Sequence, residues 1–336
     1  MTDDIAEQPA VYAGLLETGV DAIAKVARQV ADRRPRHVVF TARGTSDHAA
    51  LYAAYLTEIR LGVPAGLASP SAITVYGARP DLRDTLVVGV SQSGGSHDLC
   101  EVVRVAREQG AHTLAVTNNP GSPLAEVAEL HVDVTAGHER AVAATKTYTA
   151  ELLALLLIVE SVRGGGRLPD DERRALAELP GHAEAVLADP TAEQLAARYR
   201  FADRLVTTGR GYAYPTARET ALKLMETSYV AALAFSGADL LHGPLAMTQP
   251  DVPVIAVVGG GPAGASMRDV VKRLGERKAD LVTVGPEGTI RTPAVDERYA
   301  PLLDILPMQR LALSLALHRG EDPDTPRSLK KVTTTL

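Results

Sequence analysis

The stretch TLVVGVSQSGGS, residues 85–96, decides the fold class of this chain. Its first half is a short apolar run rich in valine, which predicts a buried β-strand, and its serines and glycines form a turn that ends the strand. A second run, HVVFTARGTS at 37–46, has the same form. Helical stretches follow both turns, so we expect parallel strands connected by helices that cover both faces of the sheet.

The alternation of strands and helices continues along the chain. An amphipathic helix is predicted over 10–33, a long apolar helix over 146–163 and a Gly/Pro-rich connector over 162–181. Further apolar strands are predicted at 112–118, 131–137, 204–211, 252–259, 279–285 and 300–307. The order strand, Gly turn, helix occurs in both halves, which indicates an internal duplication of one α/β unit.

We therefore predict an α/β protein with two tandem domains, each a flavodoxin-like parallel sheet between two layers of helices. The expected parts are an N-terminal helical segment 1–36, a first domain 37–165, a connector 166–195, and a second domain with a C-terminal tail 196–336. Ligands of such sheets bind at the carboxyl ends of the strands, so the turns after the strands are where chemistry is expected.

The composition excludes several classes of protein. The 336 residues are 46% hydrophobic and 23% charged with a net charge of −6, which argues against a disordered chain and a nucleic-acid binder. Cys100 is the single cysteine and the nine histidines lack metal-ligand spacing, so we expect no disulfide and no metal site. No uninterrupted apolar stretch reaches ~18 residues and the acidic N-terminus is unlike a signal peptide. We expect a soluble cytoplasmic protein with no membrane span.

The turn SQSGGS combines the hydroxyls of Ser91, Ser93 and Ser96 with the Gln92 amide at the start of a predicted helix. Free backbone N–H groups, hydroxyl donors and the helix dipole together bind phosphate without a positive charge. A plain polar turn that caps the helix is the alternative interpretation. Gly44, Thr45 and Ser46 end the first strand of the same unit and can converge on the same crevice, although alone they indicate only a turn.

A predicted helix over 216–230 carries Glu219, Lys223 and Glu226, whose spacings of four and three place them on one face. A solvated face with an ion pair is the alternative to a catalytic carboxylate. His242 follows in a loop between apolar residues, where a half-buried imidazole could transfer protons near neutral pH or serve a structural purpose.

The segment from Gly259 to Gly264 has the form G-x-G-x-x-G, but it follows the second predicted strand of its unit rather than the first. We therefore expect phosphate at Ser91–Ser96 and not a dinucleotide at these glycines.

Together these motifs resemble the sugar isomerase (SIS) family, in particular the isomerase half of glucosamine-6-phosphate synthase and the stand-alone hexosamine-phosphate deaminases of the same fold. The resemblance covers about residues 37–336. Its motifs are GTS at 44–46, SQSGGS at 91–96, ERAVAATKTYT at 139–149, ALKLMETSY at 221–229, HGPLA at 242–246 and DTPRSLKK at 324–331.

The resemblance implies a role for each matching residue. It assigns the phosphate to Ser91, Gln92, Ser93 and Ser96, and sugar contacts to the Gly44–Ser46 turn and Val142. Glu226 matches the carboxylate that moves a proton between C1 and C2, and Lys223 matches a lysine that supports this base. His242 matches a ring-opening histidine that the neighbouring subunit supplies, which implies a homodimer. Lys331 matches a tail lysine that lies over the sugar. The resemblance implies no cofactor.

The chain departs from the synthase pattern in several places. No glutaminase domain precedes the first unit, so we expect that this chain does not generate ammonia from glutamine. Gly95 and Ser96 replace a Glu and a Thr, and Leu233 and Leu241 replace charged residues.

The leading expectation is isomerisation with deamination of glucosamine 6-phosphate to fructose 6-phosphate and ammonia. A lyase that dehydrates N-acetylglucosamine 6-phosphate to a 2,3-unsaturated sugar is the second hypothesis, because it shares the first proton abstraction. A non-catalytic sugar-phosphate sensor is the third.

Overall fold

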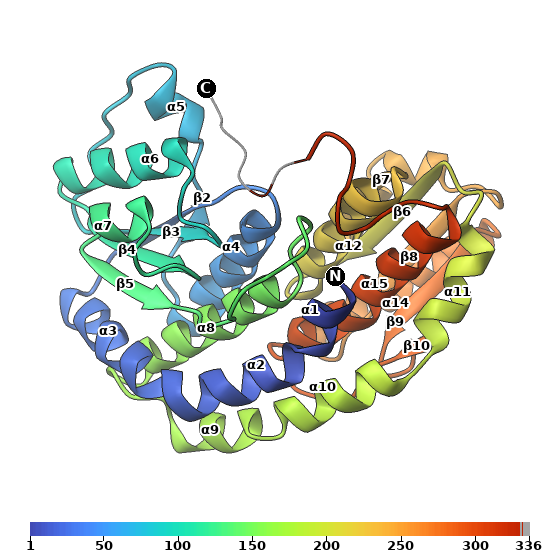
Figure 1. The fold of residues 1–336 in the computed structure, drawn as a ribbon, viewed down its shortest axis with the longest axis horizontal. Helices are drawn as coiled ribbons and strands as arrows, with labels where there is room; N and C mark the ends of the chain where they lie inside the picture. Colours follow the sequence, from blue (N-terminus) through green and yellow to red (C-terminus); the bar gives the residue numbers. More distant parts are fainter. Residues whose placement is uncertain (330, 332–336) are drawn as a thin grey trace. The chain divides into compact units, whose positions relative to one another are not determined.

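The structure is a computed structural model that describes residues 1–329 and 331. The chain divides into two compact units. The N-terminal unit comprises Glu7–Glu139 and Lys146–Pro180, together with Lys331. The C-terminal unit comprises Met1–Ala6, Arg140–Thr145 and Gly181–Leu329. Figure 1 shows one sheet in each unit with helices against it.

The sheet of the N-terminal unit has five parallel strands in the order β2-β1-β3-β4-β5. This is the flavodoxin-like order, so the predicted fold class is confirmed for this unit. The strands are β1 (His37–Thr41), β2 (Ala65–Leu67), β3 (Thr85–Ser91), β4 (His112–Thr117) and β5 (Leu130–Asp133). The sequence analysis missed β2, because this edge strand is only three residues long, contains Gly66 and directly follows Pro64.

Helices cover both faces of this sheet. One face is packed by α3 (Val20–Arg33), α4 (Thr45–Leu56) and α8 (Lys146–Arg163), and the other by α6 (His97–Glu108) and α7 (Pro123–Val127). The remaining elements are α2 (Gln8–Gly14), the π-helical turns η1 (Leu15–Gly19) and η2 (Thr57–Leu61), α5 (Pro70–Thr74) and α9 (Asp170–Leu176). The helix predicted over 10–33 is therefore interrupted by a π-helical turn.

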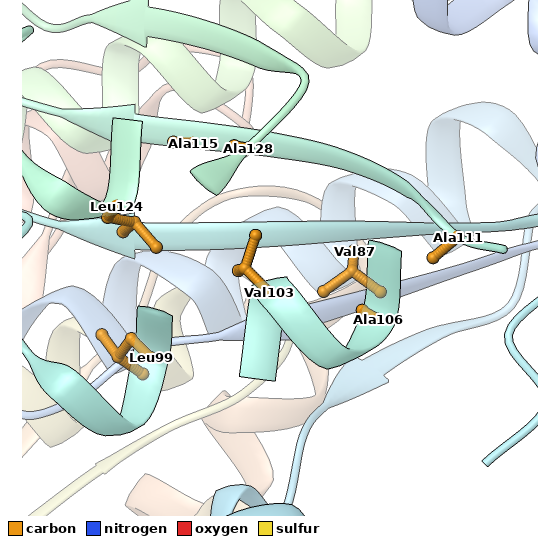
Figure 2. Packing of buried hydrophobic residues seen from close by; sticks show 8 residues of the cluster. All are labelled: Val87, Leu99, Val103, Ala106, Ala111, Ala115, Leu124 and Ala128. Atoms are coloured by element: carbon orange, nitrogen blue, oxygen red, sulfur yellow. The ribbon is translucent and has the colours of Figure 1, made fainter. Parts of the chain in front are cut away.

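The face under α6 and α7 is closely packed. Figure 2 shows its side chains, which come from β3, from β4 and the residue before it, from α6, and from α7 and the residue after it. The cluster consists of Val87, Leu99, Val103, Ala106, Ala111, Ala115, Leu124 and Ala128. A Cβ at Gly89 would lie only 3.1 Å from Leu124, so a glycine lets α7 approach the strand closely. This packing fixes the end of β3 that carries the Ser91–Ser96 turn.

The C-terminal unit repeats the topology, with five parallel strands in the order β10-β9-β8-β6-β7. They are β6 (Arg204–Gly209), β7 (Ala231–Ser236), β8 (Pro253–Val257), β9 (Asp280–Gly285) and β10 (Ile290–Arg291). Read along the chain, both sheets place the first strand between the second and the third. The fold class of two tandem parallel sheets flanked by helices is thus confirmed.

Two helices, α12 (Ala213–Ser228) and α15 (Ala300–His318), pack on one face of this sheet, and α14 (Gly261–Glu276) packs on the other. The remaining elements are α1 (Thr2–Ala6), α10 (Leu179–Ala188), α11 (Thr191–Tyr199), α13 (Gly237–Leu241) and the 3-10 turn η3 (Pro244–Met247). The residues predicted as a connector over 162–181 contain α9 and the start of α10.

The prediction of a strand at 300–307 was wrong. These residues form the first half of α15, a 19-residue helix that continues through Pro307, the residue at which the strand was predicted to end. By length and composition α15 could cross a membrane, but 78% of its most apolar 18-residue stretch is buried. It packs against α12 and α11 and serves as the central helix of this core.

Candidate functional site

The turns after β1 and β3 lie side by side at the carboxyl edge of the N-terminal sheet. These strands are neighbours, with Thr41 paired to Gly89, and their connections leave in opposite directions along the sheet. This is the topological switch point, where open α/β sheets bind their ligands. The structure therefore brings the predicted Gly44–Ser46 and Ser91–Ser96 turns to one edge of one sheet.

The Ser91–Ser96 turn is held by its own side chains. The Gly94 N–H donates to Ser91 Oγ at 3.2 Å, and the Gly95 N–H donates to Ser93 Oγ at 3.2 Å. Ser96 is the N-cap residue of α6 but its hydroxyl makes no capping hydrogen bond. That hydroxyl and the first N–H groups of α6 can therefore donate hydrogen bonds to a bound anion.

Gly94 is required at the centre of this turn for two reasons. Its φ of +62° lies in the left-handed region, which costs a residue with a Cβ about 1–2 kcal/mol. A Cβ would also lie 2.2 Å from Ser122 Oγ, a fully buried hydroxyl that caps α7. A larger residue would push the turn away from the sheet.

Arg43 links the two turns at the switch point and was missed in the sequence analysis. Its guanidinium donates from Nε and from a terminal nitrogen to Asp98 Oδ2, at 2.8 and 2.7 Å. Asp98 is buried in the first turn of α6, where its charge would repel a phosphate. The pairing neutralises this carboxylate and places a cation beside the turn. The position of Arg43 directly before Gly44 is the only signal that sequence offered.

Ser46 has a buried partner that sequence reasoning also missed. Its Oγ donates to Glu151 Oε1 at 2.9 Å, and both side chains are almost completely buried. Glu151 belongs to α8, where it is one of two acidic residues in a run of apolar positions. A carboxylate in such a helix is the signal that could have drawn attention to it. Because the Ser46 hydroxyl donates its hydrogen to the bond with Glu151, its oxygen can still accept a hydrogen bond from a ligand.

In the C-terminal unit, α12 carries a row of three charged side chains, two of which are buried. Lys223 Nζ lies 3.3 Å from a Glu219 oxygen and 2.5 Å from Glu226 Oε2. Glu219 and Lys223 are buried, and the Glu226 side chain is 22% exposed. The alternative of a solvated ion pair is therefore wrong for this face. Only Glu226 reaches solvent, so it is the member that can meet a ligand.

Two opposing effects act on the Lys223 ammonium. Burial by itself lowers the pKa of Lys223, and the Coulombic attraction of Glu219 and then Glu226 outweighs it, so that its pKa lies above the usual value. The lysine is a permanent cation that holds the Glu226 carboxylate in one position. A general base needs a carboxylate oxygen that is held in place and can be reached by the substrate.

His242 lies at the end of α13, where its N–H donates to the Asp239 carbonyl. The expectation of a half-buried imidazole was wrong, since the residue is exposed. The short helix brings it to the surface, because its apolar neighbour Leu240 faces the core. No hydrogen bond or ion pair joins His242 to Glu226 among the described residues of the chain.

The C-terminal motif is anchored beside the base. Arg327 donates its N–H to the Tyr229 hydroxyl at 2.7 Å, and its guanidinium lies 4.4 Å from the centre of that ring. Tyr229 directly follows α12, three residues after Glu226, and it ends the helix in a left-handed conformation. Lys331 is four residues further on and is exposed.

Val142 lies in the segment Arg140–Thr145, which belongs to the C-terminal unit. Asp4 holds this segment, because its buried carboxylate accepts N–H bonds from Arg140 and Ala141 at 3.0–3.2 Å. Val142 itself is half-buried. The N-terminal helix α1 thus positions a predicted sugar-contacting residue, a role that no sequence motif indicated.

The comparisons with known proteins agree with this fold. The sequence profile described as the SIS domain matches residues 33–161 and 199–288. The chain belongs to the SIS domain family. A curated relative, the isomerising glutamine–fructose-6-phosphate aminotransferase of Thermococcus kodakarensis, is 33% identical over 349 residues, which cover 99% of this chain and 58% of the relative. The chain thus spans a little over half the length of the curated relatives it matches.

Two solved structures match nearly end to end. A candidate phosphosugar isomerase from Silicibacter pomeroyi DSS-3 is 32% identical with a TM-score of 0.86, covering 96% of this chain and 98% of that one. The C-terminal domain of glucosamine-fructose-6-phosphate aminotransferase from Francisella tularensis is 25% identical with a TM-score of 0.85, covering 97% and 98%.

The switch point of the second SIS domain differs from that of the first. Here the N-terminus of α14, at Gly261, is met by the Glu297 carboxylate, which accepts the Ala263 N–H. A Cβ at Gly261 would lie 2.4 Å from Glu297 Oε2. Burial, and then the neighbouring Asp296, raise the pKa of Glu297 despite that hydrogen bond. The chain's own carboxylate thus occupies the anion position at Gly259–Gly264.

Within residues 1–329 and 331, no group of three or more His, Cys, Asp or Glu side chains is arranged to hold an ion.

Proposed function

We propose that this chain is a phosphosugar isomerase of the SIS type that acts on glucosamine 6-phosphate and releases fructose 6-phosphate and ammonia. The observation that carries the proposal is the row of charged side chains on α12, in which buried Lys223 fixes the partly exposed Glu226. An aldose–ketose isomerisation needs one base that takes a proton from C2 and returns it to C1. Glu226 has the exposure and the held geometry for that task.

The proton transfer and the loss of ammonia balance without a cofactor. In the open-chain sugar, the C2 proton goes to Glu226 and then to C1, and a proton from the amino group on C2 goes to O1, so that the aldehyde carbon becomes a hydroxymethyl group. The nitrogen on C2 is left as an imine, and addition of one water releases ammonia and leaves the ketone. A positioned base of this kind contributes ~10²–10⁴-fold to the rate.

The phosphate is assigned to the Ser91–Ser96 turn. Its hydroxyls and N–H groups at the start of α6 suit a dianion, and Arg43 supplies a nearby positive charge. Ser46, whose proton is given to Glu151, would accept a hydrogen bond from a sugar hydroxyl or ammonium group. Exposed His242 would assist ring opening in a neighbouring copy of the chain, which makes the proposed enzyme a homodimer. Lys331 would cover the bound sugar.

The test is incubation of the purified protein with glucosamine 6-phosphate and, separately, with its N-acetyl form in D₂O. We expect ammonia, fructose 6-phosphate and deuterium at C1 from the first compound. An ultraviolet-absorbing enone from the N-acetyl form would replace the proposal with the lyase reaction. Binding of both compounds with no turnover would replace it with a sensor.

Two variants test whether Glu226 is the base. Glu226→Gln should abolish deuterium exchange while the substrate still binds, and Glu276→Gln, on the exposed end of α14, is the matched control. Wild-type exchange in Glu226→Gln would exclude this residue as the base.

A further inference from the structure

The N-terminal unit contains an apolar cavity on the sheet face opposite to the cluster of Figure 2. Its volume is about 280 Å³, and it lies between the strands, through Phe40, Val88 and Leu114, and the helices α3 and α8. Protein interiors contain few voids larger than a water molecule. The other face of the same sheet is filled, so the cavity is a local feature of this face.

The lining is suited to a hydrocarbon. The strand residues alternate with those of Figure 2, and α8 contributes Leu155 and Val159, all nearly buried. The Thr57 hydroxyl in the wall already donates to the Ala53 carbonyl at 2.8 Å. An apolar lining of this kind favours a small apolar group over water.

One charged side chain, Arg34, joins this lining. It ends α3 with a left-handed φ of +47°, which is a strained conformation for a residue with a Cβ. Its neighbour Arg33 is paired with Glu129 at 2.8 Å, whereas Arg34 has no carboxylate partner within residues 1–329 and 331. The cavity therefore offers an apolar interior and one exposed guanidinium.

We propose that this cavity is a binding site for a small amphipathic carboxylate, with the hydrocarbon part inside and the carboxylate on Arg34. The volume suits a chain of roughly six to ten carbons, since a void of about 150 Å³ takes up benzene. The π-helical turn Thr57–Leu61 forms part of the wall, and such turns are frequent at functional sites.

Two helices, α4 and α8, connect the cavity to the switch point. Ser46 lies in the first turn of α4, which continues at its other end into the π-helical turn. Glu151 lies on α8, and Leu155 and Val159 follow it at spacings of four on one face. Filling the cavity would shift these helices against the sheet and alter the Ser46–Glu151 pair. This regulatory step rests on the proposed function, whereas the binding step does not.

Isothermal titration of the whole chain with octanoate, and with 1-octanol as the uncharged probe, tests the binding. We expect octanoate to bind, and Val159→Phe, which places a ring in the cavity, to weaken both probes at least tenfold. Arg34→Gln should weaken octanoate about fivefold, the worth of one exposed ion pair, and leave octanol unchanged. Arg36→Gln, an exposed neighbour outside the lining, is the matched control.

An unchanged or raised melting temperature shows that Val159→Phe is folded. No octanoate binding to the wild type, or equal binding to the folded Val159→Phe variant, would overturn the proposed site. Saturating octanoate should also change the dissociation constant of glucosamine 6-phosphate in the wild type and not in Val159→Phe. An equal dissociation constant would overturn the regulatory step, whereas absence of all sugar-phosphate binding would count against the proposed function alone.

Discussion

Asp304 makes the stability of the C-terminal unit depend on pH. Its carboxyl is 1% exposed in α15, where Oδ1 accepts a 2.7 Å hydrogen bond from Thr292 Oγ1 and the buried Oδ2 has no partner among the described residues. Burial raises the pKa of Asp304 from its ordinary 3.8 to about 7, against the smaller lowering effect of Thr292. The perturbation is Asp304→Asn, which keeps the shape and cannot ionise.

The sign follows from proton binding. Between the two pKa values the folded state keeps the proton that the unfolded state has lost, so the free energy of unfolding falls as pH rises. The full contribution is present below pH 3.8 and is lost once pH exceeds about 7. The slope is about 1.4 kcal/mol per pH unit, and it amounts to roughly 2.5 kcal/mol between about pH 5 and pH 8.

Urea unfolding of both proteins across this pH range gives the difference directly. Asp304→Asn loses some stability at every pH, because its amide N–H groups are buried without an acceptor, and this constant cost of about 1–3 kcal/mol cancels in the comparison. We expect the wild type to lose stability relative to Asp304→Asn as pH rises, with the change complete near pH 8. A difference that stays constant across the range would refute the reasoning.

Three further predictions concern the site. Lys223→Met should lower the free energy of unfolding by about 3–5 kcal/mol, because it leaves buried carboxylates without a cation, and should abolish turnover; unchanged urea unfolding would contradict the burial argument. Gly94→Ala should weaken sugar-phosphate binding at least tenfold in a titration, since the added Cβ clashes with Ser122, while a surface Gly14→Ala control leaves it unchanged. If active sites are shared between two copies, mixing inactive Glu226→Gln with inactive His242→Ala should restore about a quarter of the wild-type activity, provided that mass measurement shows mixed dimers. No recovery in verified mixed dimers would place His242 outside the site.

The central strands of both sheets could be predicted from sequence because each is a buried apolar run followed by a turn signal. β3 and β8 are of this kind. β7, by contrast, is half-exposed and rich in alanine, so neither its composition nor a period-2 pattern indicated a strand. The prediction for residues 300–307 failed for another reason. This stretch of eight residues, apolar except for Asp304, is compatible with a buried strand or a buried helix, and only the length of the whole run distinguishes them.

The pairs that organise the site could not be predicted from spacing. Ser46 and Glu151 are 105 residues apart, and Arg43 and Asp98 are 55 apart. Each pair exists because the topology brings the start of one helix to a neighbouring helix or turn. The motif analysis found one member of the first pair and neither member of the second, since a motif describes residues that are close in sequence.

The three charges of α12 show how tertiary packing decides between two interpretations of one motif. The spacing of Glu219, Lys223 and Glu226 places them on one helix face, whether that face meets water or a core. Burial comes from α15, which packs along α12 and whose Ala312 carbonyl lies 3.4 Å from the hydroxyl of Thr227, one turn beyond Lys223. An exposed ion pair would contribute little and would leave Glu226 mobile. With the lysine buried and held by two carboxylates, the geometry of Glu226 is fixed by a helix that begins more than 70 residues later in the chain.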